Sequence, residues 1–255
     1  MGNNFAAVIL AAGKGTRLAQ GASSPRPKVL YEIAGKPLIA HTLRVLNKIG
    51  PNEVVIVVGH KAKDVIEAVG VGYKFAIQKQ RLGTGHAAKV GLNELSSEAE
   101  DVLIINGDDS AFYRPDTIKS LLEKHLNEQN TITFITLEPE DPTGLGRIVR
   151  KNGELIGIVE EKVASAEQKK IREINDGAYV FNLGWLERTI KKLKKSAVGE
   201  YYLTDLIDLA LTEDKRVSTL KLSDPNEWKG VNTPAELVEA DKQMRDRDKN
   251  ASEKR

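Results

Sequence analysis

The chain has 255 residues, of which 40% are hydrophobic and 29% charged, with a formal net charge of +2 and no cysteine. This composition is ordinary for a globular protein of one large or two small α/β domains, and the balanced charge excludes a global attraction to nucleic acid or to anionic membranes. The lack of cysteine excludes disulfides, thiolate zinc sites and cysteine nucleophiles. Because the sequence has no leader pattern and no apolar run near the ~20 residues that span a bilayer, we expect a cytoplasmic protein.

The first half of the chain alternates apolar runs typical of strands with amphipathic patterns typical of helices. The expected strands cover residues 5–10, 53–58, 73–78, 102–105 and 131–136, and the expected helices cover residues 37–49, 62–69, 85–95 and 115–128. This alternation predicts an α/β fold with a Rossmann-like, mostly parallel sheet covered on both faces. Ligands of such sheets bind beyond the carboxyl ends of the strands, where the turns after Leu10 and Ile105 lie.

The second half is expected to add a small antiparallel insertion. Strand patterns over residues 146–150 and 155–159 flank Asn152-Gly153, which is a strong hairpin signal. A further strand over residues 177–182 precedes a helix over residues 184–194.

The last amphipathic helix is expected to begin near Thr233-Pro234. From Asp241 to Arg255 nearly every residue is charged or polar, with both signs mixed. This pattern predicts a solvated helix end or tail rather than an arm that binds nucleic acid.

The first expected strand ends in a glycine-rich turn that carries two cations. The turn reads Leu10-Ala11-Ala12-Gly13-Lys14-Gly15-Thr16-Arg17-Leu18, and a third cation follows in Pro27-Lys28-Val29-Leu30. Glycine lets the backbone approach a ligand and turn its N–H groups towards an anion. The alternative is an ordinary glycine turn with solvated cations, but turn, cations and spacing together favour a polyphosphate site.

This turn fits neither of two common phosphate-binding loops. A P-loop needs Ser or Thr after its Lys, whereas Gly15 follows Lys14. A dinucleotide fingerprint needs a third glycine where Leu18 stands, and this mismatch also weakens the alternative of a nicotinamide-dependent oxidoreductase.

The pattern that remains, G-x-G-T-R followed by P-K, resembles the signature of the nucleotide-sugar pyrophosphorylases. Its fuller form is most similar to the uridylyltransferase domain of the N-acetylglucosamine-1-phosphate uridylyltransferases. The resemblance implies catalytic roles for Arg17, Lys28 and Lys14. It also implies that the nucleotide is bound by the turn itself, at Leu10, Ala11, Ala12, Gly13, Gly15 and Thr16.

A second motif, Gln78-Lys79-Gln80-Arg81-Leu82-Gly83-Thr84-Gly85-His86, follows the third expected strand. A carboxamide both donates to and accepts from the edge of a base. The resemblance implies that Gln78, Gly83 and Thr84 read uracil, whereas Arg81 departs from the family pattern. We interpret His86 as a residue of the first helical turn that shapes this loop rather than as a general base.

An acidic turn, Asn106-Gly107-Asp108-Asp109, ends the fourth expected strand. A carboxylate at this edge of a sheet is well placed to hold Mg²⁺ against phosphate oxygens. In the family, an aspartate after G and an asparagine in a late G-V-N hold the metal together, which implies Asp108 and Asn232 here. Asn106 stands where the family is often aromatic, and Asp109 is interpreted as a second metal ligand or, preferably, a helix cap.

Four motifs of the second half resemble the sugar-binding motifs of the family, in the family's order. They are Asp141-Pro142-Thr143-Gly144-Leu145-Gly146-Arg147, Gly157-Ile158-Val159-Glu160, Glu173-Ile174-Asn175-Asp176-Gly177 and Gly199-Glu200-Tyr201-Tyr202-Leu203-Thr204-Asp205. The resemblance implies sugar contacts by Gly144, Glu160, Asn175, Tyr202 and Asn232. Asp176 replaces a small hydroxyl residue, and each motif by itself could be only a turn or a cap, Thr204 especially.

The resemblance implies a Mg²⁺-dependent transfer from UTP to N-acetylglucosamine 1-phosphate, which gives UDP-N-acetylglucosamine and pyrophosphate. The implied nucleotidyltransferase domain covers residues 1–240, with a nucleotide-binding half (5–136) and a sugar-binding half (137–232), before the charged segment 241–255. Because the sequence shows no hexapeptide repeat, we do not expect the family's acetyltransferase β-helix in this chain. Without that trimerisation module, we expect a monomer or a homodimer.

Two alternatives stay open at this point. Asn106, Asp109 and Asp176 leave room for glucose 1-phosphate or another sugar 1-phosphate as the acceptor. A non-catalytic nucleotide-sugar sensor of the same fold is the alternative of another class, although such a protein would be expected to lose Arg17, Lys28 or Asp108.

Overall fold

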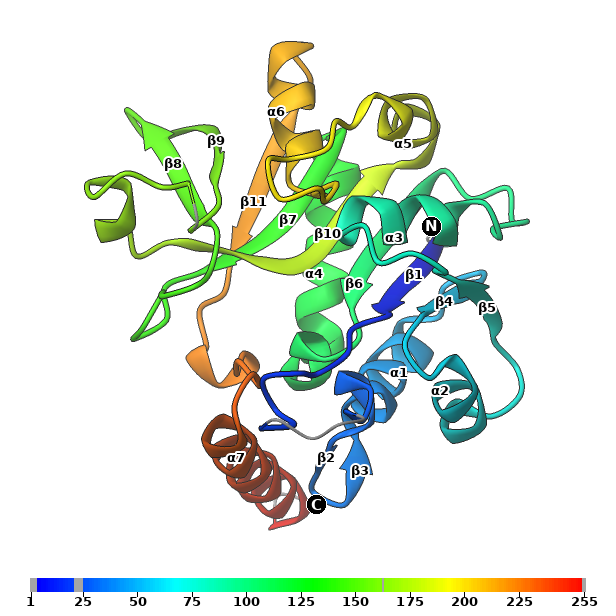
Figure 1. Cartoon of the computed structure of the whole chain (residues 1–255). Helices are drawn as coiled ribbons and strands as arrows, with labels where there is room; N and C mark the ends of the chain where they lie inside the picture. Colours follow the sequence, from blue (N-terminus) through cyan, green and yellow to red (C-terminus); the bar gives the residue numbers. More distant parts are fainter. Residues whose placement is uncertain (1–3, 21–24, 162, 254–255) are drawn as a thin grey trace.

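The computed structural model describes residues 4–20, 25–161 and 163–253 (Figure 1). Residues 1–3, 21–24, 162 and 254–255, which belong to the predicted segments 1–240 and 241–255, lie outside the described residues. Nine of the described strands form one sheet: β1 (Phe5–Ala11), β4 (Val54–Val58), β5 (Lys74–Ile77), β6 (Asp101–Asn106), β7 (Ile132–Leu137), β8 (Arg147–Lys151), β9 (Glu154–Val159), β10 (Ile174–Asn182) and β11 (Val217–Lys221). A separate two-stranded ribbon consists of β2 (Glu32–Ile33) and β3 (Lys36–Pro37).

The sheet is mostly parallel, as predicted. Its order is β11-β7-β10-β6-β1-β4-β5, and the neighbours β1–β4, β1–β6, β4–β5 and β7–β11 are parallel. The five strands expected in the first half are found within one residue of their predicted ends. Only β10 reverses the direction within this path, because it is antiparallel to both β6 and β7.

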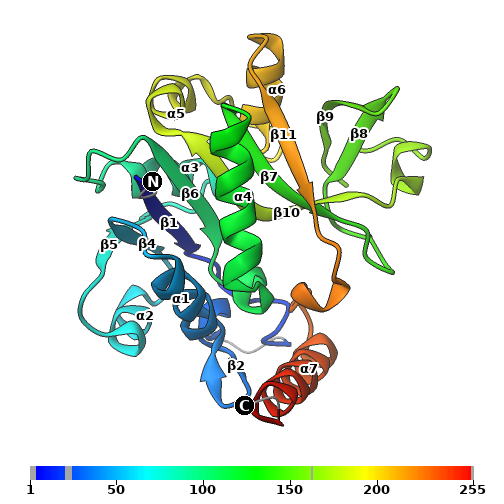
Figure 2. The same cartoon turned by 180° about the vertical axis from the view of Figure 1, so that it is seen from behind.

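Helices cover both faces of the sheet, as the two opposite views show (Figures 1 and 2). The helices are α1 (Leu38–Ile49), α2 (Ala62–Val69), α3 (Thr84–Leu92), α4 (Pro115–Asn127), α5 (Leu183–Thr189), α6 (Asp205–Thr212) and α7 (Pro234–Glu253). Short 3₁₀ turns are η1 (Lys28–Leu30), η2 (Asp109–Phe112), η3 (Gln168–Lys170), η4 (Ile190–Lys192) and η5 (Pro225–Glu227). One core lies between the sheet and α1, α2 and α4, and a second lies between the sheet and α3, α5 and α6.

The central strand β1 shows why both faces are covered. Successive side chains of a strand point to opposite faces, and in β1 Ala7 and Ile9 enter the first core while Val8 enters the second. A strand that is apolar on both sides requires helices on both sides, which explains the continuous apolar run in the sequence.

The antiparallel part of the second half is the β8–β9 hairpin, which projects from the sheet beside β10 (Figure 1). Asn152 and Gly153 form its turn with φ of 52° and 85°, which is the left-handed backbone that an Asn-Gly hairpin turn requires. The predicted hairpin is therefore confirmed.

A wide bulge interrupts β10 where it crosses the sheet edge. Its register against β7 jumps from Asn175 opposite Thr136 to Tyr179 opposite Phe134, so β10 has two more residues than β7 over this interval. Bulges redirect side chains and are frequent beside active sites. Because β10 is antiparallel, this bulge, with Asp176 and Gly177, lies at the edge where the parallel strands end.

Two elements of the second half were not expected from the sequence, α6 and β11. The expected helix over residues 184–194 is α5 followed by the short turn η4. The charged segment after Asp241 continues α7 to Glu253, and it is not solvated throughout, because Met244 is fully buried against Val231 and Phe112.

Candidate active site

A cavity of about 320 Å³ opens at the carboxyl edge of the parallel strands. Its walls come from five segments: the end of β1 with the turn after it, the start of η1, the loop between β5 and α3 with the start of α3, the end of β6 with the turn after it, and the loop before α6. Among the predicted site residues it is lined by Leu10, Ala12, Gly13, Lys28, Gln78, Gly83, Thr84, Asp108 and Tyr202. Residues that are distant in the sequence thus share one pocket because their strands are neighbours in one sheet.

The glycine turn delivers Lys28 to this pocket. Gly15 has a φ of +68°, and a Cβ atom at this position would lie 3.0 Å from the carbonyl oxygen of Arg26 and 3.2 Å from the Lys28 nitrogen. The Lys28 N–H donates to the carbonyl of Gly13 at 3.4 Å. Only a residue without a Cβ allows this close contact, so Gly15 lets the P-K segment fold back onto the turn.

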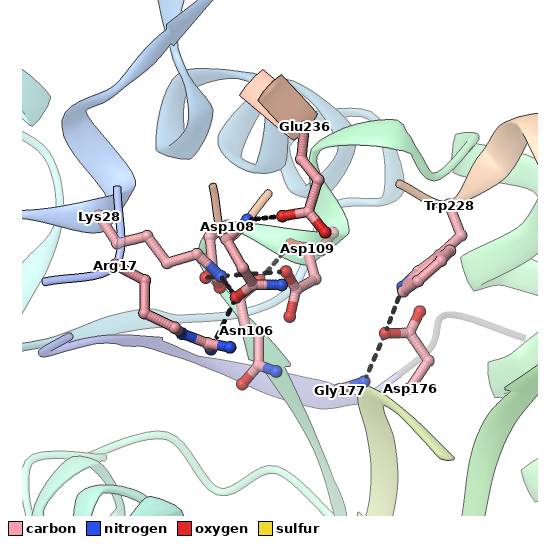
Figure 3. A network of polar contacts seen from close by, with 12 residues as sticks. Arg17, Lys28, Asn106, Asp108, Asp109, Asp176, Gly177, Trp228 and Glu236 are labelled. Carbon is pink, nitrogen blue, oxygen red and sulfur yellow. Dashed lines mark hydrogen bonds and ion pairs between the residues drawn. The ribbon is translucent and has the colours of Figure 1, made fainter. Parts of the chain in front are cut away.

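The Lys28 ammonium is the centre of a polar cluster (Figure 3). It forms an ion pair with Asp108 and lies 3.4 Å from Asp109, and it donates to the side-chain oxygen of Asn232 at 3.2 Å. Burial lowers the pKa of Lys28, but the two carboxylates outweigh burial and raise that pKa above its ordinary value. Asp108 and Asn232, predicted as partners in one metal site, are therefore brought together.

Asp109 does not act as a helix cap in this structure. It is the first residue of η2, yet its carboxylate faces Lys28 instead of a backbone N–H group of the turn. Burial and the neighbouring charge of Asp108 raise the pKa of Asp109. The interpretation of Asp109 as a cap is therefore not supported by its contacts.

Arg17 and Lys14 leave the same turn but have different surroundings. Arg17 is exposed and donates to the side-chain oxygen of Asn232 at 2.9 Å. Lys14 is half-buried and has no ion-pair partner among the described residues. Thr16 is exposed, and Ala11 is the buried last residue of β1.

A capping box at the start of α7 fixes the backbone of Asn232. Glu236 accepts from the backbone N–H of Asn232 at 2.6 Å and from that of Thr233 at 2.8 Å, and the Thr233 hydroxyl accepts from the Glu236 N–H at 3.2 Å. The spacing Thr-x-x-Glu before a helix is the local sequence signal for this arrangement.

The loop expected to read the base is tied to the motif that contains Tyr202. The Tyr201 N–H donates to the Leu82 carbonyl at 2.7 Å, and the Gly85 N–H donates to the Tyr201 carbonyl at 2.9 Å. The Leu203 N–H donates to the Thr84 hydroxyl at 3.0 Å. Gly83 has a φ of +94°, and a Cβ there would lie 2.5 Å from the Tyr201 carbonyl, so only glycine fits.

Asp176 is a buried carboxylate that links three segments of the site. It accepts from the Tyr113 hydroxyl, from the Gly177 N–H at 2.8 Å and from the Trp228 indole N–H at 3.2 Å (Figure 3). Burial and the charge of Asp109 raise its pKa to about 7, although the three donors act in the opposite direction. Trp228 precedes Gly230-Val231-Asn232, so Asp176 connects the bulge of β10 with the segment that carries Asn232.

Glu160, Asn175 and the Gly144 loop lie near one another beside the hairpin. The Thr204 hydroxyl donates to Glu160 at 3.0 Å, and a Cβ on Gly146 would lie 3.7 Å from the Glu160 carboxylate. The Asn175 N–H donates to the Gly146 carbonyl at 3.0 Å. Thr204 precedes α6 but makes no capping hydrogen bond with its side chain, because its hydroxyl is directed to Glu160.

Sequence reasoning missed several residues of the site. They are Glu236, Trp228 and Tyr113, and Tyr113 reaches Asp176 from the end of η2. The cavity is also lined by Arg81, Asn106, Asp109 and Glu200, which belong to motifs found in the sequence. No local sequence pattern marks Tyr113 or Trp228 as part of the site. Tyr113 is 63 positions from Asp176 in the sequence and Trp228 is 52 positions from it, so only the fold brings them together.

Whether the site fits a metal ion depends on its oxygen atoms. Among the described residues, no three His, Cys, Asp or Glu side chains converge on one point. The oxygens that meet at the Lys28 ammonium are two carboxylates and one amide oxygen, from Asp108, Asp109 and Asn232. Mg²⁺ prefers oxygen ligands and is usually bound through one or two carboxylates plus water and phosphate oxygens. This donor set fits Mg²⁺.

None of the helices in the described part of the chain has an apolar stretch long enough to cross a membrane.

Known proteins resemble this chain in sequence and in fold. Two curated relatives called Bifunctional protein GlmU, from Streptococcus mutans and Thermoanaerobacter pseudethanolicus, are 41% and 40% identical to the chain. Each alignment covers 94% of the chain but only 52% and 51% of the relatives, so the chain spans about half the length of the curated relatives it matches.

Two solved structures share the fold at low sequence identity. One is described as a glucose-1-phosphate thymidylyltransferase from Bacillus anthracis, with a TM-score of 0.79, 23% identity and coverage of 95% of this chain and 96% of that one. The other is an inositol-1-phosphate CTP transferase from T. maritima, with a TM-score of 0.70, 18% identity and coverage of 94% and 95%. The model of the nucleotidyl transferase family matches residues 6–247, nearly the whole chain. With this match and relatives of about 40% identity, the resemblance seen in the sequence is confirmed, and the chain belongs to the nucleotidyl transferase family.

Proposed function

We propose that the chain is a Mg²⁺-dependent sugar-1-phosphate uridylyltransferase that makes UDP-N-acetylglucosamine and pyrophosphate from UTP and N-acetylglucosamine 1-phosphate. The observation that carries this proposal is the convergence of Arg17, Lys28, Asp108 and Asn232 from four segments into one polar cluster, of which Lys28 and Asp108 line the cavity. A non-catalytic sensor would not need two cations and two oxygen ligands in contact at the phosphate end. We further propose residues 5–136 as the nucleotide-binding half and residues 137–232 as the sugar-binding half.

The chemistry that this cluster supports needs no general base. The acceptor phosphate, with a second pKa of about 6, is already an anion at neutral pH. One of its oxygens attacks the α-phosphorus of UTP, and the bond from that phosphorus to the bridging oxygen breaks, so that pyrophosphate leaves with the electron pair. The barrier is the repulsion between two polyanions, and it is lowered by positioning and by positive charge.

Each residue of the cluster is assigned one part of this task. The N–H groups of the glycine turn and the guanidinium of Arg17 stabilise the leaving pyrophosphate, and Lys28 lies between the α-phosphate and the sugar phosphate. Lys14 extends the positive charge towards the β- and γ-phosphates. Asp108 and Asn232 would hold Mg²⁺, which when bound supplies further positive charge against the phosphate oxygens. The Lys28–Asp108 ion pair must then exchange for contacts with substrate.

The surroundings of Asn175 are the evidence for an N-acetylated sugar as the acceptor. Its side-chain oxygen is buried and has no hydrogen-bond partner among the described residues, while its amide nitrogen donates to the Tyr179 hydroxyl at 2.6 Å. A buried acceptor without a partner is costly, and an acetamido N–H or a sugar hydroxyl would satisfy it. Glu160, with one oxygen bound to Thr204, offers a second acceptor for sugar hydroxyls, and Gly144 and Tyr202 complete the proposed sugar contacts.

Glucose 1-phosphate is the second candidate acceptor, and the contacts of Asn106 favour it. A Cβ on Gly177 would lie 1.9 Å from the Asn106 amide, so the Asn106 side chain packs directly on the bulge that carries Asn175 and Asp176. Because Asn106 both lines the cavity and packs on Gly177, it reduces the space at this end of the site, and a smaller acceptor without an acetamido group would fit it.

The test is a grid of pyrophosphate release with Mg²⁺. Four nucleoside triphosphates are combined with the 1-phosphates of N-acetylglucosamine, glucose, galactose and mannose. Release from UTP with N-acetylglucosamine 1-phosphate is the expected result. Release from UTP with glucose 1-phosphate would support the second candidate, and binding of UDP-sugar without release from any pair would overturn the enzymatic proposal in favour of a sensor.

A further inference from the structure

The side chain of Gln78 is fixed by two hydrogen bonds at the base end of the cavity. Gln78 is 4% exposed, follows β5 and lines the cavity. Its amide nitrogen Nε2 donates to the carbonyl of Gly83 at 3.1 Å and lies 3.0 Å from Nδ1 of His86. Among the described residues, both hydrogen bonds of this carboxamide involve the same nitrogen.

The Gly83 carbonyl decides which end of the carboxamide faces the loop. A carbonyl oxygen only accepts, so the atom of Gln78 that faces Gly83 must be the N–H₂ group. The carbonyl cannot turn away easily, since the loop is fixed by the Tyr201–Leu82 and Gly85–Tyr201 hydrogen bonds, at 2.7 and 2.9 Å. The opposite orientation would place two oxygens against each other.

With Nε2 as a donor, Nδ1 of His86 must be the acceptor. A neutral imidazole has one protonated and one unprotonated nitrogen, whereas an imidazolium has two N–H groups and accepts nothing. Contact with Gln78 therefore requires a neutral His86 with its proton on Nε2. His86 lies in the first turn of α3, and the Tyr201 ring stacks on it at a centroid distance of 6.5 Å.

The surroundings of His86 favour the neutral form. Burial, followed by the charge of Lys89 one turn later on α3, lowers the pKa of His86 below its ordinary value. Lys89 and Lys191 line the same hollow as His86 and Tyr201, and the Lys195 ammonium lies 5.8 Å from the Tyr201 ring centre. Glu200 is a carboxylate on the loop after η4 beside Tyr201, and Lys89 is the charged group that shifts the pKa of His86.

We propose that His86 is a positioning residue for base recognition, which holds the Gln78 carboxamide so that its oxygen Oε1 faces the cavity as an acceptor. This inference rests on the proposed function and deepens it, because it assigns the residue that orients the group expected to read the base. An acceptor at this point matches the N3–H donor of uracil or thymine, whereas N3 of cytosine is itself an acceptor and meets Oε1 unfavourably. A reversed carboxamide would present a donor and prefer cytosine.

The first test observes the tautomer directly, without substrate. The chain has four histidines, and a long-range ¹H–¹⁵N spectrum of the ¹⁵N-histidine-labelled protein at pH 7.5 distinguishes the two nitrogens of each ring. The His86 signals are assigned by their loss in a His86→Asn variant. An unprotonated Nδ1 and a protonated Nε2 are expected. A proton on Nδ1, or a charged ring, would overturn the proposal whatever the enzyme's substrates are.

The second test compares two substitutions of the same size class. In His86→Asn the side-chain oxygen occupies nearly the position of Nδ1 and still accepts from Gln78, whereas His86→Leu fills the space without an acceptor. For His86→Leu the preference for UTP over CTP in kcat/KM is expected to fall about 3- to 10-fold, the effect of one neutral hydrogen bond. His86→Asn is expected to keep the preference. Equal losses in both variants, or none in His86→Leu, would contradict the positioning role.

The pH dependence gives a third readout that a purely structural histidine would not produce. Below the pKa of His86 the imidazolium gains an N–H at Nδ1 and can no longer accept from Gln78, so the UTP/CTP preference of the unmodified protein is expected to fall at a pH below 6.5, the ordinary pKa of histidine. Acid affects the phosphates of both nucleotides alike, so this effect cancels in the ratio. Protonation of cytosine N3 in more acidic solution lowers the ratio in both proteins, so a larger fall is expected in the unmodified protein than in His86→Asn, and equal falls would contradict the proposal.

Failure of this inference and failure of the proposed function are distinguishable. If no nucleotide is turned over, UDP and CDP binding replaces the kinetic ratio, and the tautomer measurement is unaffected. If UTP is turned over with a sugar phosphate but Nδ1 of His86 is protonated, the function stands and the inference falls.

Discussion

The Lys28 ammonium and the side-chain oxygen of Asn232 lie 3.2 Å apart although 204 positions separate them in the sequence. The same oxygen accepts from Arg17 at 2.9 Å. Asn232 therefore gathers one cation from the glycine turn and one from the P-K segment into a single cluster with Asp108. Holding like charges together before substrate arrives is a form of electrostatic preorganisation, and it places positive charge where a transferred phosphate would need it.

Arg17→Ala is expected to lower turnover by roughly 10²–10³-fold, because the guanidinium acts on charge that develops in the transition state. Stability is expected to be unchanged, since Arg17 is exposed. The measurement is kcat from pyrophosphate release, together with thermal unfolding.

Lys14→Ala is the matched control for this substitution. It also removes one cation from the turn, but Lys14 has no ion-pair partner among the described residues, whereas Arg17 contacts Asn232. The loss of turnover is therefore expected to be smaller than in Arg17→Ala. Near-normal turnover in Arg17→Ala would refute the assigned role.

Asp108→Asn is expected to abolish the response of the rate to Mg²⁺ in the millimolar range, because it removes the proposed carboxylate ligand. The measurement is a Mg²⁺ titration of the initial rate, and Mn²⁺ binding followed by electron paramagnetic resonance reports on the ion without turnover. Asp109→Asn removes a neighbouring negative charge that also faces Lys28, and it is expected to weaken Mn²⁺ binding less than Asp108→Asn does, because Asp109 is not one of the two proposed ligands. An unchanged titration in Asp108→Asn would place the ligand elsewhere.

Asp176 is expected to make the fold less stable as the pH rises. Its pKa is about 7 in the folded state and 3.8 ordinarily, so from pH 4 upwards the unfolded chain loses this proton before the folded protein does. The free energy of unfolding therefore falls between about pH 4 and pH 7, by an amount on the order of 3–4 kcal/mol.

Asp176→Asn keeps the size of the side chain and removes the titration. Urea unfolding at pH 4.5 and pH 7.5 is expected to show that the variant gains stability relative to the unmodified protein at the higher pH. A difference between the two proteins that does not change with pH would mean that Asp176 ionises as an ordinary carboxyl group. Fluorescence of Trp228, which donates to this carboxylate, provides a local readout of the same titration.

Glu236→Ala is expected to cost about 1 kcal/mol, the usual value of a helix cap, and to lower the melting temperature by roughly 2–4 °C for a chain of this size. Because the backbone of Asn232 loses its acceptor, Mn²⁺ affinity is expected to fall as well. Glu236→Gln still accepts from both N–H groups and is expected to restore most of the stability. A stable Glu236→Ala with unchanged Mn²⁺ affinity would show that the cap does not position Asn232.

Most periodic elements of the first half could be predicted from the sequence to within one residue; the exception is α3, which ends at Leu92 and not at residue 95. The apolar patterns of β1, β4, β6 and β7 are strong because these strands are buried on both faces, as Ala7, Val8 and Ile9 show for β1. Of the elements that were missed, the strand β11 lacks this property. All but the last residue of β11 are half-buried, and that residue, Lys221, is exposed, so no strict alternation marks the strand as an edge strand of the sheet.

The sequence by itself determined which residue types are available for the proposed chemistry, because residue types and spacing in G-x-G-T-R, P-K, G-D and G-V-N are local properties of the chain. It also determined the family and the α/β class. Only the tertiary structure decided which side chains meet. Three hydrogen bonds depend on the direction and distance that the fold gives to each side chain: Asp176 with Trp228, Glu236 with the Asn232 backbone, and His86 with Gln78. The antiparallel insertion of β10 and its bulge, which no local pattern encodes, bring Asn175 and Asp176 to the edge where the parallel strands end.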